Sequence, residues 1–166
     1  EEWMTLESSG SLLMGVASSG TTAVVVGLDG RVASSGDLVT WTEVTQDDEK
    51  TPAFEEDFYA VASGGSGFIV VGEDGVKLWS EDGSVWVKEE GTIPLYDVAW
   101  GGEIFVAVGE GGARKQADAS GDWATPVFGG DDLTGVVYGD GRWVAVGLGR
   151  SLISEDAQDW ESHPQD

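Results

Sequence analysis

Three short stretches of the chain place a serine, an aspartate and a tryptophan at one fixed spacing. A serine near a carboxylate is a candidate nucleophile, and carboxylates in turns are candidate calcium ligands. A catalytic or metal site needs one convergent set of side chains, however, whereas this set recurs along the chain. We therefore interpret the motif as a structural turn, in which Ser and Asp oxygens accept backbone N–H groups and the Trp packs as an apolar plug. The three copies are Ser35, Asp37 and Trp41; Ser80, Asp82 and Trp86; and Ser154, Asp156 and Trp160.

A fourth copy, "ADASGDW" at residues 117–123, keeps the tryptophan but has Ala117 and Ala119 in place of the serine and the aspartate. A scaffold tolerates such a loss, which favours the structural interpretation. The four tryptophans are spaced by 45, 37 and 37 residues, and a glycine that ends an apolar run recurs after 45, 37 and 38 residues. Both series place the extra length in the segment 45–57. The glycines are Gly27, Gly72, Gly109 and Gly147.

The two landmarks define four repeats within a single domain of residues 1–166. In the second repeat, turn signals separate four strand candidates, "FYAVAS", "GFIVVG", "VKLWS" and "VWVKE". The second strand of each repeat is apolar on successive residues, so both of its faces must be covered, and no helical periodicity is present to cover them. We therefore predict an all-β protein, a β-propeller of four four-stranded blades, either a closed four-blade ring or an arc completed by another copy. The repeats are 12–45, 58–90, 95–127 and 133–163.

The stretch "YGDGRWVAVGLGRSLISEDAQDW", residues 138–160, resembles the Asp-box, or sialidase-like, propeller repeats of bacterial proteins, including the photosystem-assembly-factor type. The resemblance extends over nearly the whole chain and implies that the Ser-Asp turns join the third and fourth strands, away from the usual ligand face. It does not extend to sialidase activity, because the arginines do not match the catalytic arginine motif of that family. These arginines are Arg31, Arg114, Arg142 and Arg150.

Composition narrows the function further. The chain has 31 acidic and 8 basic residues, a net charge of −23, one histidine and no cysteine. This balance argues against nucleic acid and anionic membranes as partners, and no apolar run is long enough for a membrane-spanning helix. Without cysteine there are no disulfides or thiolate sites, and His163 lies in the polar tail, so a Ser-His-Asp triad has little support. We expect no enzyme and no cofactor, although a carboxylate pair for glycoside hydrolysis remains open among so many acids.

The segment between the first two repeats is the one weak candidate for a metal site. Oxygen-rich loops bind Ca²⁺, but the spacing is not that of an EF-hand, and a solvated acidic loop is the preferred interpretation. The candidate ligands are Asp47, Asp48, Glu55, Glu56 and Asp57.

Five of the eight basic residues fall at the start of the third strand of their repeats. In a propeller this position predicts a loose basic ring near one face, which either pairs with local acids or meets the acidic loops of a partner. The residues are Arg31, Lys77, Arg114, Lys115 and Arg150.

Trp3 lies in a segment that resembles a fifth outer strand, residues 1–8, although each other strand type occurs four times. An unpaired strand edge is a liability, so this strand is expected either to close the ring or to pair with a neighbouring molecule. Trp3 therefore joins the basic ring as a candidate interface.

The sequence favours a non-enzymatic structural or interaction propeller that assembles with other copies of itself, as an oligomer or a filament, or binds another protein. We expect it outside the cell or on its surface, because the chain reads as a processed one that does not start with Met. The alternative is a carbohydrate-binding, lectin-like propeller, and a glycoside hydrolase is less favoured. The aromatic residues in question are Tyr59, Tyr96, Trp100 and Tyr138, which we expect to pack between blades.

Overall fold

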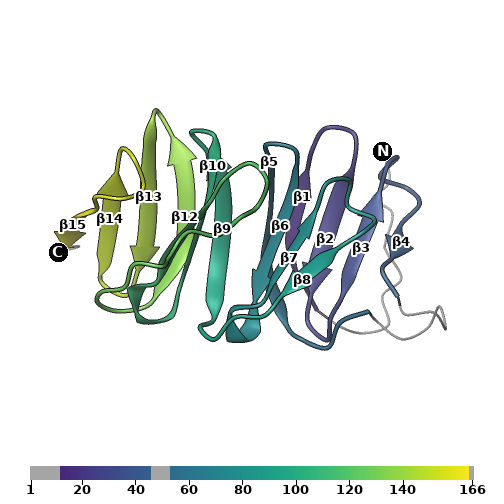
Figure 1. The fold of residues 1–166 in the computed structure, drawn as a ribbon, viewed down its shortest axis with the longest axis horizontal. Coiled ribbons are helices and arrows are strands. Elements are labelled where there is room, and N and C mark those ends of the chain that lie inside the picture. Colours follow the sequence, from purple (N-terminus) through teal and green to yellow (C-terminus); the bar gives the residue numbers. More distant parts are fainter. Residues whose placement is uncertain (1–11, 46–52, 165–166) are drawn as a thin grey trace.

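The structure is a computed structural model, and it describes residues 12–45 and 53–164 (Figure 1). The described residues form four antiparallel sheets, each a simple meander in which consecutive strands pair. The chain is therefore an all-β propeller-type repeat protein, as predicted. The first blade is β1 (Leu13–Ser18), β2 (Ala23–Gly27), β3 (Val32–Ser35) and β4 (Thr42–Glu43), and the second is β5 (Phe58–Gly64), β6 (Gly67–Gly72), β7 (Lys77–Ser80) and β8 (Val87–Glu89).

The third and fourth blades follow the same plan. The third has β9 (Leu95–Gly101), β10 (Ile104–Gly109) and β11 (Arg114–Ala117), and the fourth has β12 (Leu133–Gly139), β13 (Arg142–Gly147), β14 (Arg150–Ser154) and β15 (Glu161–Pro164). Short 3₁₀ turns, η1 (Glu73–Gly75) and η2 (Glu110–Gly112), precede the third strands of the second and third blades. In the described ranges no helix is long and apolar enough to cross a membrane.

The third blade departs from the predicted four strands. Its outer strand is reduced to two isolated bridges, from Ala117 to Trp123 and from Arg114 to Val127. Pro126 lies in this segment and has no N–H to donate to a ladder, which accounts for the interruption.

The core lies between the blades. Three apolar clusters fill the three successive blade–blade interfaces, and all residues of β6 and nearly all of β10 are buried. This agrees with the prediction that neighbouring repeats cover both faces of the second strand. In the fourth blade, β13 alternates between buried and more exposed residues, so only one of its faces is covered.

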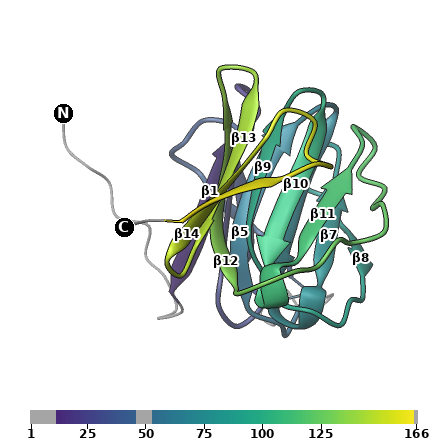
Figure 2. The ribbon, with the colours of Figure 1, turned by 90° about the vertical axis from the view of Figure 1, so that its left-hand side faces the viewer.

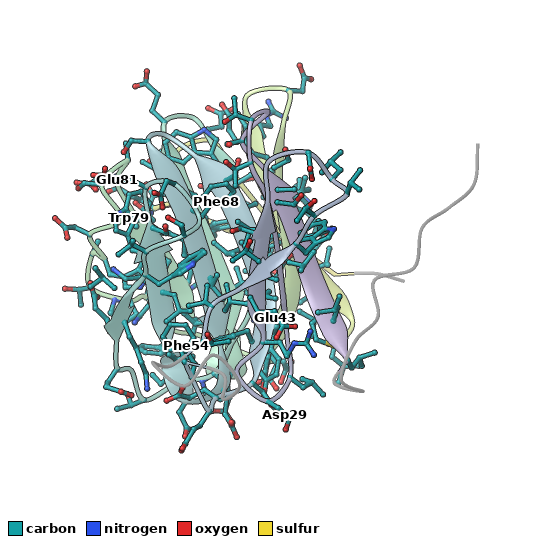
Figure 3. All side chains as sticks on the ribbon, turned by 90° about the vertical axis from the view of Figure 1, so that its right-hand side faces the viewer. Asp29, Glu43, Phe54, Phe68, Trp79 and Glu81 are labelled. Atoms are coloured by element: carbon teal, nitrogen blue, oxygen red, sulfur yellow. The ribbon has the colours of Figure 1, made fainter. Side chains whose placement is uncertain are left out.

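The blades form an open row. The inner strands pack in the order β1, β5, β9, β12, whereas β12 and β1 make no comparable contact. Figure 1 shows the first and fourth blades at opposite ends of the row, and Figures 2 and 3 look onto the fourth-blade end and the first-blade end. Of the two predicted arrangements, the described residues adopt the arc and not the closed four-blade ring.

Candidate interaction surfaces

The Ser-Asp turns are closed by hydrogen bonds between their own residues. In the second blade, the amides of Ser84 and Val85 donate to Asp82 Oδ1 at 2.8 and 3.2 Å, and the amide of Gly83 donates to Ser80 Oγ at 2.8 Å. The first and fourth blades repeat this pattern around Asp37 and Asp156. The serine hydroxyls are therefore engaged in the turns, each of which joins a third strand to a fourth.

The same amides set the charge state of the aspartates. Hydrogen bonds from backbone N–H groups stabilise the carboxylate and lower the pKa of Asp37 and of Asp82 to about 2. The pKa of Asp156 is lowered for the same reason. These acids thus act as fixed anionic acceptors within the turns.

The third turn is rebuilt and not lost. Asp118, one residue before the expected aspartate position, accepts from the amide of Ser120 at 2.9 Å and from its hydroxyl at 2.6 Å. The amide of Asp122 also donates to Asp118 Oδ1, at 3.3 Å. Asp118 thus accepts from one amide equivalent to that bound by the motif serine and from one equivalent to an amide bound by the motif aspartate, a shift that the sequence interpretation of this copy as decayed missed.

Trp86 and Trp160, in the turns of the second and fourth blades, pack against the apolar clusters between blades. The indole N–H of Trp86 donates to the carbonyl of Gly83 at 3.2 Å, and that of Trp160 donates to the carbonyl of Ala157 at 2.8 Å. The ring of Trp86 lies 6.4 Å from that of Phe68 in the core between the first two blades. Trp41 is likewise half-buried.

Two members of the predicted basic ring are inside the molecule. Arg31 is 4% exposed and pairs with Glu43, and Lys77 is 2% exposed and lies 2.7 Å from the carboxylate of Glu89. A desolvated cation needs a partner close by, so these side chains bind within the chain and present no exposed charge. This corrects the expectation that they form an accessible interface.

The other members of that ring are half-buried. Lys115 lies 5.7 Å from the ring centroid of Trp123, and burial lowers its pKa. Burial also lowers the pKa of Arg114, and nearby Arg150 adds to the effect. Arg150 donates hydrogen bonds to the carbonyls of Gly129 and Asp131 at 3.1 and 2.7 Å. These bonds connect Arg150 to the loop that leads into the fourth blade.

The weak metal candidates are only partly within the described residues. Asp47 and Asp48 lie outside them, and so does Trp3, the N-terminal candidate for an interface. Glu56 pairs with Lys88, and Asp57 Oδ1 accepts from the amide of Asp29 at 3.0 Å, while Glu55 is exposed. In residues 12–45 and 53–164 no group of three or more His, Cys, Asp or Glu side chains is placed to hold a metal ion.

The inner-strand aromatics contact neighbouring rings. The ring centroid of Trp100 lies 4.5 Å from that of Phe105, and the centroid of Tyr138 lies 4.9 Å from that of Trp143. Trp100 and Tyr138 are half-buried. A Cβ built on Gly64 would lie 1.9 Å from Trp100, so the ring of Trp100 in the third blade packs directly on the second blade.

Asp97 is a linking residue that sequence reasoning missed. Its carboxylate accepts from the amide of Val98 at 2.9 Å and from that of Val136, in the next blade, at 2.8 Å. Desolvation raises its pKa, and the two amides oppose that rise. An acid at the inner-strand position held by Gly15, Ala60 and Gly135 in the other repeats was the available signal.

Apolar side chains are exposed at the two ends of the row. Val16 on β1 is 69% exposed and Val146 on β13 is 45% exposed. Their counterparts in the other blades are buried in the interfaces between blades. Sequence reasoning missed these surfaces because every repeat has a valine at both positions, so the pattern itself gives no sign of which copies lack a neighbour.

Comparison with known proteins agrees with this architecture. No family model matches the chain, and no curated protein matches it. Among solved structures it is similar to YCF48 from Cyanidioschyzon merolae, at 19% identity and a TM-score of 0.69 over 94% of this chain and 57% of that one. A structure of YCF48 bound to D1 peptide matches at 17% identity, a TM-score of 0.69, and 93% and 55% coverage.

Two computationally designed proteins are also similar. Ika4 matches at 16% identity and a TM-score of 0.68 over 99% of this chain and 98% of its own. Ika8 matches at 17% identity and a TM-score of 0.70 over 92% of this chain and 49% of its own. The chain therefore spans little more than half of YCF48 and about half of Ika8. At these identities the likeness shows the fold, which is that of a β-propeller built from repeats.

Proposed function

We propose that the chain is a non-enzymatic, extracellular interaction module that binds other protein chains through the apolar faces at the two ends of its blade row. The observation that carries the proposal is the exposure of Val16 and Val146 at positions where every equivalent valine is buried. Apolar surface is costly to leave in water, and large exposed patches mark interaction sites. The structure of YCF48 bound to D1 peptide gives a precedent for a protein partner on a related fold.

A structural role for the Ser-Asp turns supports the non-enzymatic part of the proposal. The serines are 2–4% exposed and already bonded in their turns, so these hydroxyls are poorly placed to act as nucleophiles. The half-buried aromatic rings favour packing between blades over stacking on sugars. A glycan array tests the carbohydrate-binding alternative, and specific binding of a glycan there would overturn our preference.

Site-specific photo-crosslinking tests the proposal. A photoreactive residue at position 146 should crosslink to protein in extracts of the source cells, whereas the same residue at position 85 should not. Val85 is a suitable control, because it is 73% exposed on the turn between β7 and β8, away from both ends of the row. Equal crosslinking at the two positions, or none at position 146, would contradict the proposal. Fractionation of the same cells tests the extracellular location.

A further inference from the structure

The three blade–blade interfaces of the molecule are copies of one another. Each cluster contains a valine from the second strand of one blade and a valine from the inner strand of the next. The strand registers place all four second-strand valines at one equivalent position, and likewise all four inner-strand valines. The pairs that share a cluster are Val26 with Val61, Val71 with Val98, and Val108 with Val136.

One valine of each kind has no counterpart within the described chain. The second-strand valines Val26, Val71 and Val108 are 0% exposed, whereas the fourth, Val146, is 45% exposed. The inner-strand valines Val61, Val98 and Val136 are 5–9% exposed, whereas the first, Val16, is 69% exposed. Val146 and Val16 are therefore the two valines of this set that lack an equivalent partner in the described residues, and they lie at opposite ends of the row.

The Ser-Asp turn of the first blade exposes a further apolar side chain at the end of the row where Val16 lies. The turn position held by Gly83 in the second blade and Ala157 in the fourth is buried against the preceding blade. In the first blade this position is Leu38, which is 67% exposed and has a φ of 61°. An exposed leucine in a left-handed conformation costs free energy, which contact with a preceding blade would offset.

The glycine that ends the inner strand gives matching evidence at the other end. A Cβ on Gly64 or Gly101 would run into Trp100 or Tyr138 of the following blade, at 1.9 and 2.2 Å. The same position in the fourth blade is Gly139, where a Cβ would meet nothing within 4 Å. Gly139 thus leaves open space on the side where a following blade would pack.

We propose that the partner is a second copy of this chain, with the Val146 face of each copy packed on the Val16 face of the other, and this rests on the proposed function. A second copy fits because its first blade carries the missing half of an interface that the chain already forms three times. The contact is head to tail, and when it forms at both ends it closes two copies into a ring. Two copies supply eight blades, four from each chain. The match of one copy to Ika8 covers 49% of the Ika8 chain.

Cysteine crosslinking tests this arrangement. The chain has no cysteine, so every disulfide comes from an introduced residue. Under mild oxidation, a mixture of the V16C and V146C proteins should form a disulfide-linked heterodimer, and neither protein alone should crosslink. The V16C/V146C double variant should give one discrete two-chain product on a non-reducing denaturing gel. The intramolecular pair V71C/V98C is the geometric control for an equivalent valine pair. A ladder of products, a crosslinked monomer, or crosslinking of either single variant alone would overturn the two-copy ring.

Mass measurement across a concentration series gives an independent result. The unmodified protein should sediment as a dimer, and Val146→Asp or Val16→Asp should weaken association at least about a hundredfold, because each buries an unpaired charge. Val85→Asp should leave association unchanged. A monomer at all concentrations would refute the second-copy partner. If photo-crosslinking at position 146 then identified a different protein, the proposed function would stand without this inference.

Discussion

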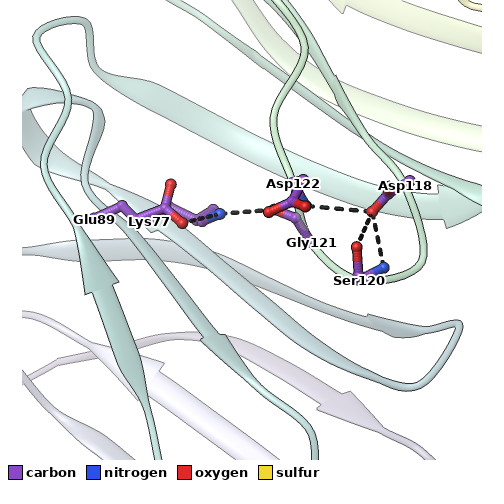
Figure 4. A network of polar contacts seen from close by, with 6 residues as sticks. All are labelled: Lys77, Glu89, Asp118, Ser120, Gly121 and Asp122. Atoms are coloured by element: carbon purple, nitrogen blue, oxygen red, sulfur yellow. Dashed lines mark hydrogen bonds and ion pairs between the residues drawn. The ribbon is translucent and has the colours of Figure 1, made fainter.

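The ammonium group of Lys77, in the second blade, donates a hydrogen bond to the carbonyl oxygen of Gly121, in the third blade, at 2.6 Å. The same ammonium lies 2.7 Å from Glu89, and Gly121 belongs to the turn that Asp118 organises (Figure 4). Lys77, which the sequence suggested to be an exposed interface charge, thus links two blades, and we call this contact the Lys77 clamp.

This clamp predicts an asymmetric response to mutation. Glu89→Ala leaves the buried ammonium without its counter-charge and should lower the free energy of unfolding by about 3 kcal/mol. Lys77→Met removes the charge itself and leaves one carbonyl unpaired, which should cost about 1–2 kcal/mol. Urea unfolding at neutral pH measures both. Glu90→Ala, which removes an exposed pair with Lys88, is the control and should cost less than about 1 kcal/mol. An equal or larger loss for Lys77→Met would show that the unpaired buried charge does not explain the effect of Glu89→Ala.

Equivalent glycines should respond differently to the same substitution. A Cβ on Gly64 would lie 1.9 Å from Trp100, so Gly64→Ala should lower the free energy of unfolding by about 1–3 kcal/mol. Gly139→Ala meets open space and should stay within about 0.5 kcal/mol of the unmodified protein. Chemical unfolding of dilute protein measures the pair. Equal losses at the two positions would show that the interface between blades is not the cause.

The turn aspartates predict loss of stability in acid. The pKa of Asp82 in the folded protein is about 2, below its ordinary value of 3.8, so the carboxylate stabilises the fold above about pH 4. That contribution should fall as the pH drops from about 4 to 2. Thermal unfolding from pH 2 to 6 should show a shallower acid decline for Asp82→Asn than for the unmodified protein. Asp140→Asn, on the turn between β12 and β13, serves as the control, and a slope equal to that of Asp82→Asn would count against this explanation.

Leu38 should trade monomer stability for association. Its φ of 61° favours glycine, so Leu38→Gly should raise the stability of the isolated chain by up to about 1 kcal/mol. Ala157→Gly, at the equivalent position, removes a buried methyl and should not be stabilising. Dilute thermal unfolding measures stability, and sedimentation measures the loss of association expected for Leu38→Gly. A destabilised Leu38→Gly monomer would show that the side chain packs within its own chain.

Local features of the sequence determined the class of fold. Alternating and continuous apolar runs, interrupted by Gly and Asp turns, predicted the blades, and the Trp and Gly spacings predicted their number. These features are readable because strand pairing and turn closure depend on residues close together in the chain. For the same reason, the spacing of Ser, Asp and Trp was enough to interpret their motif as a turn.

Only the tertiary structure decided which side chains are buried and which are available. Lys77 is buried and links two blades, although the sequence suggested an exposed charge. Asp118 accepts the turn amides in the third blade in place of an aspartate at position 119. Asp97 connects the third and fourth blades. Val16 and Val136 occupy equivalent positions, yet one is 69% exposed and the other 9%. Their local sequence does not distinguish them, because the difference is whether another blade lies against that face, and this depends on contacts between distant parts of the chain.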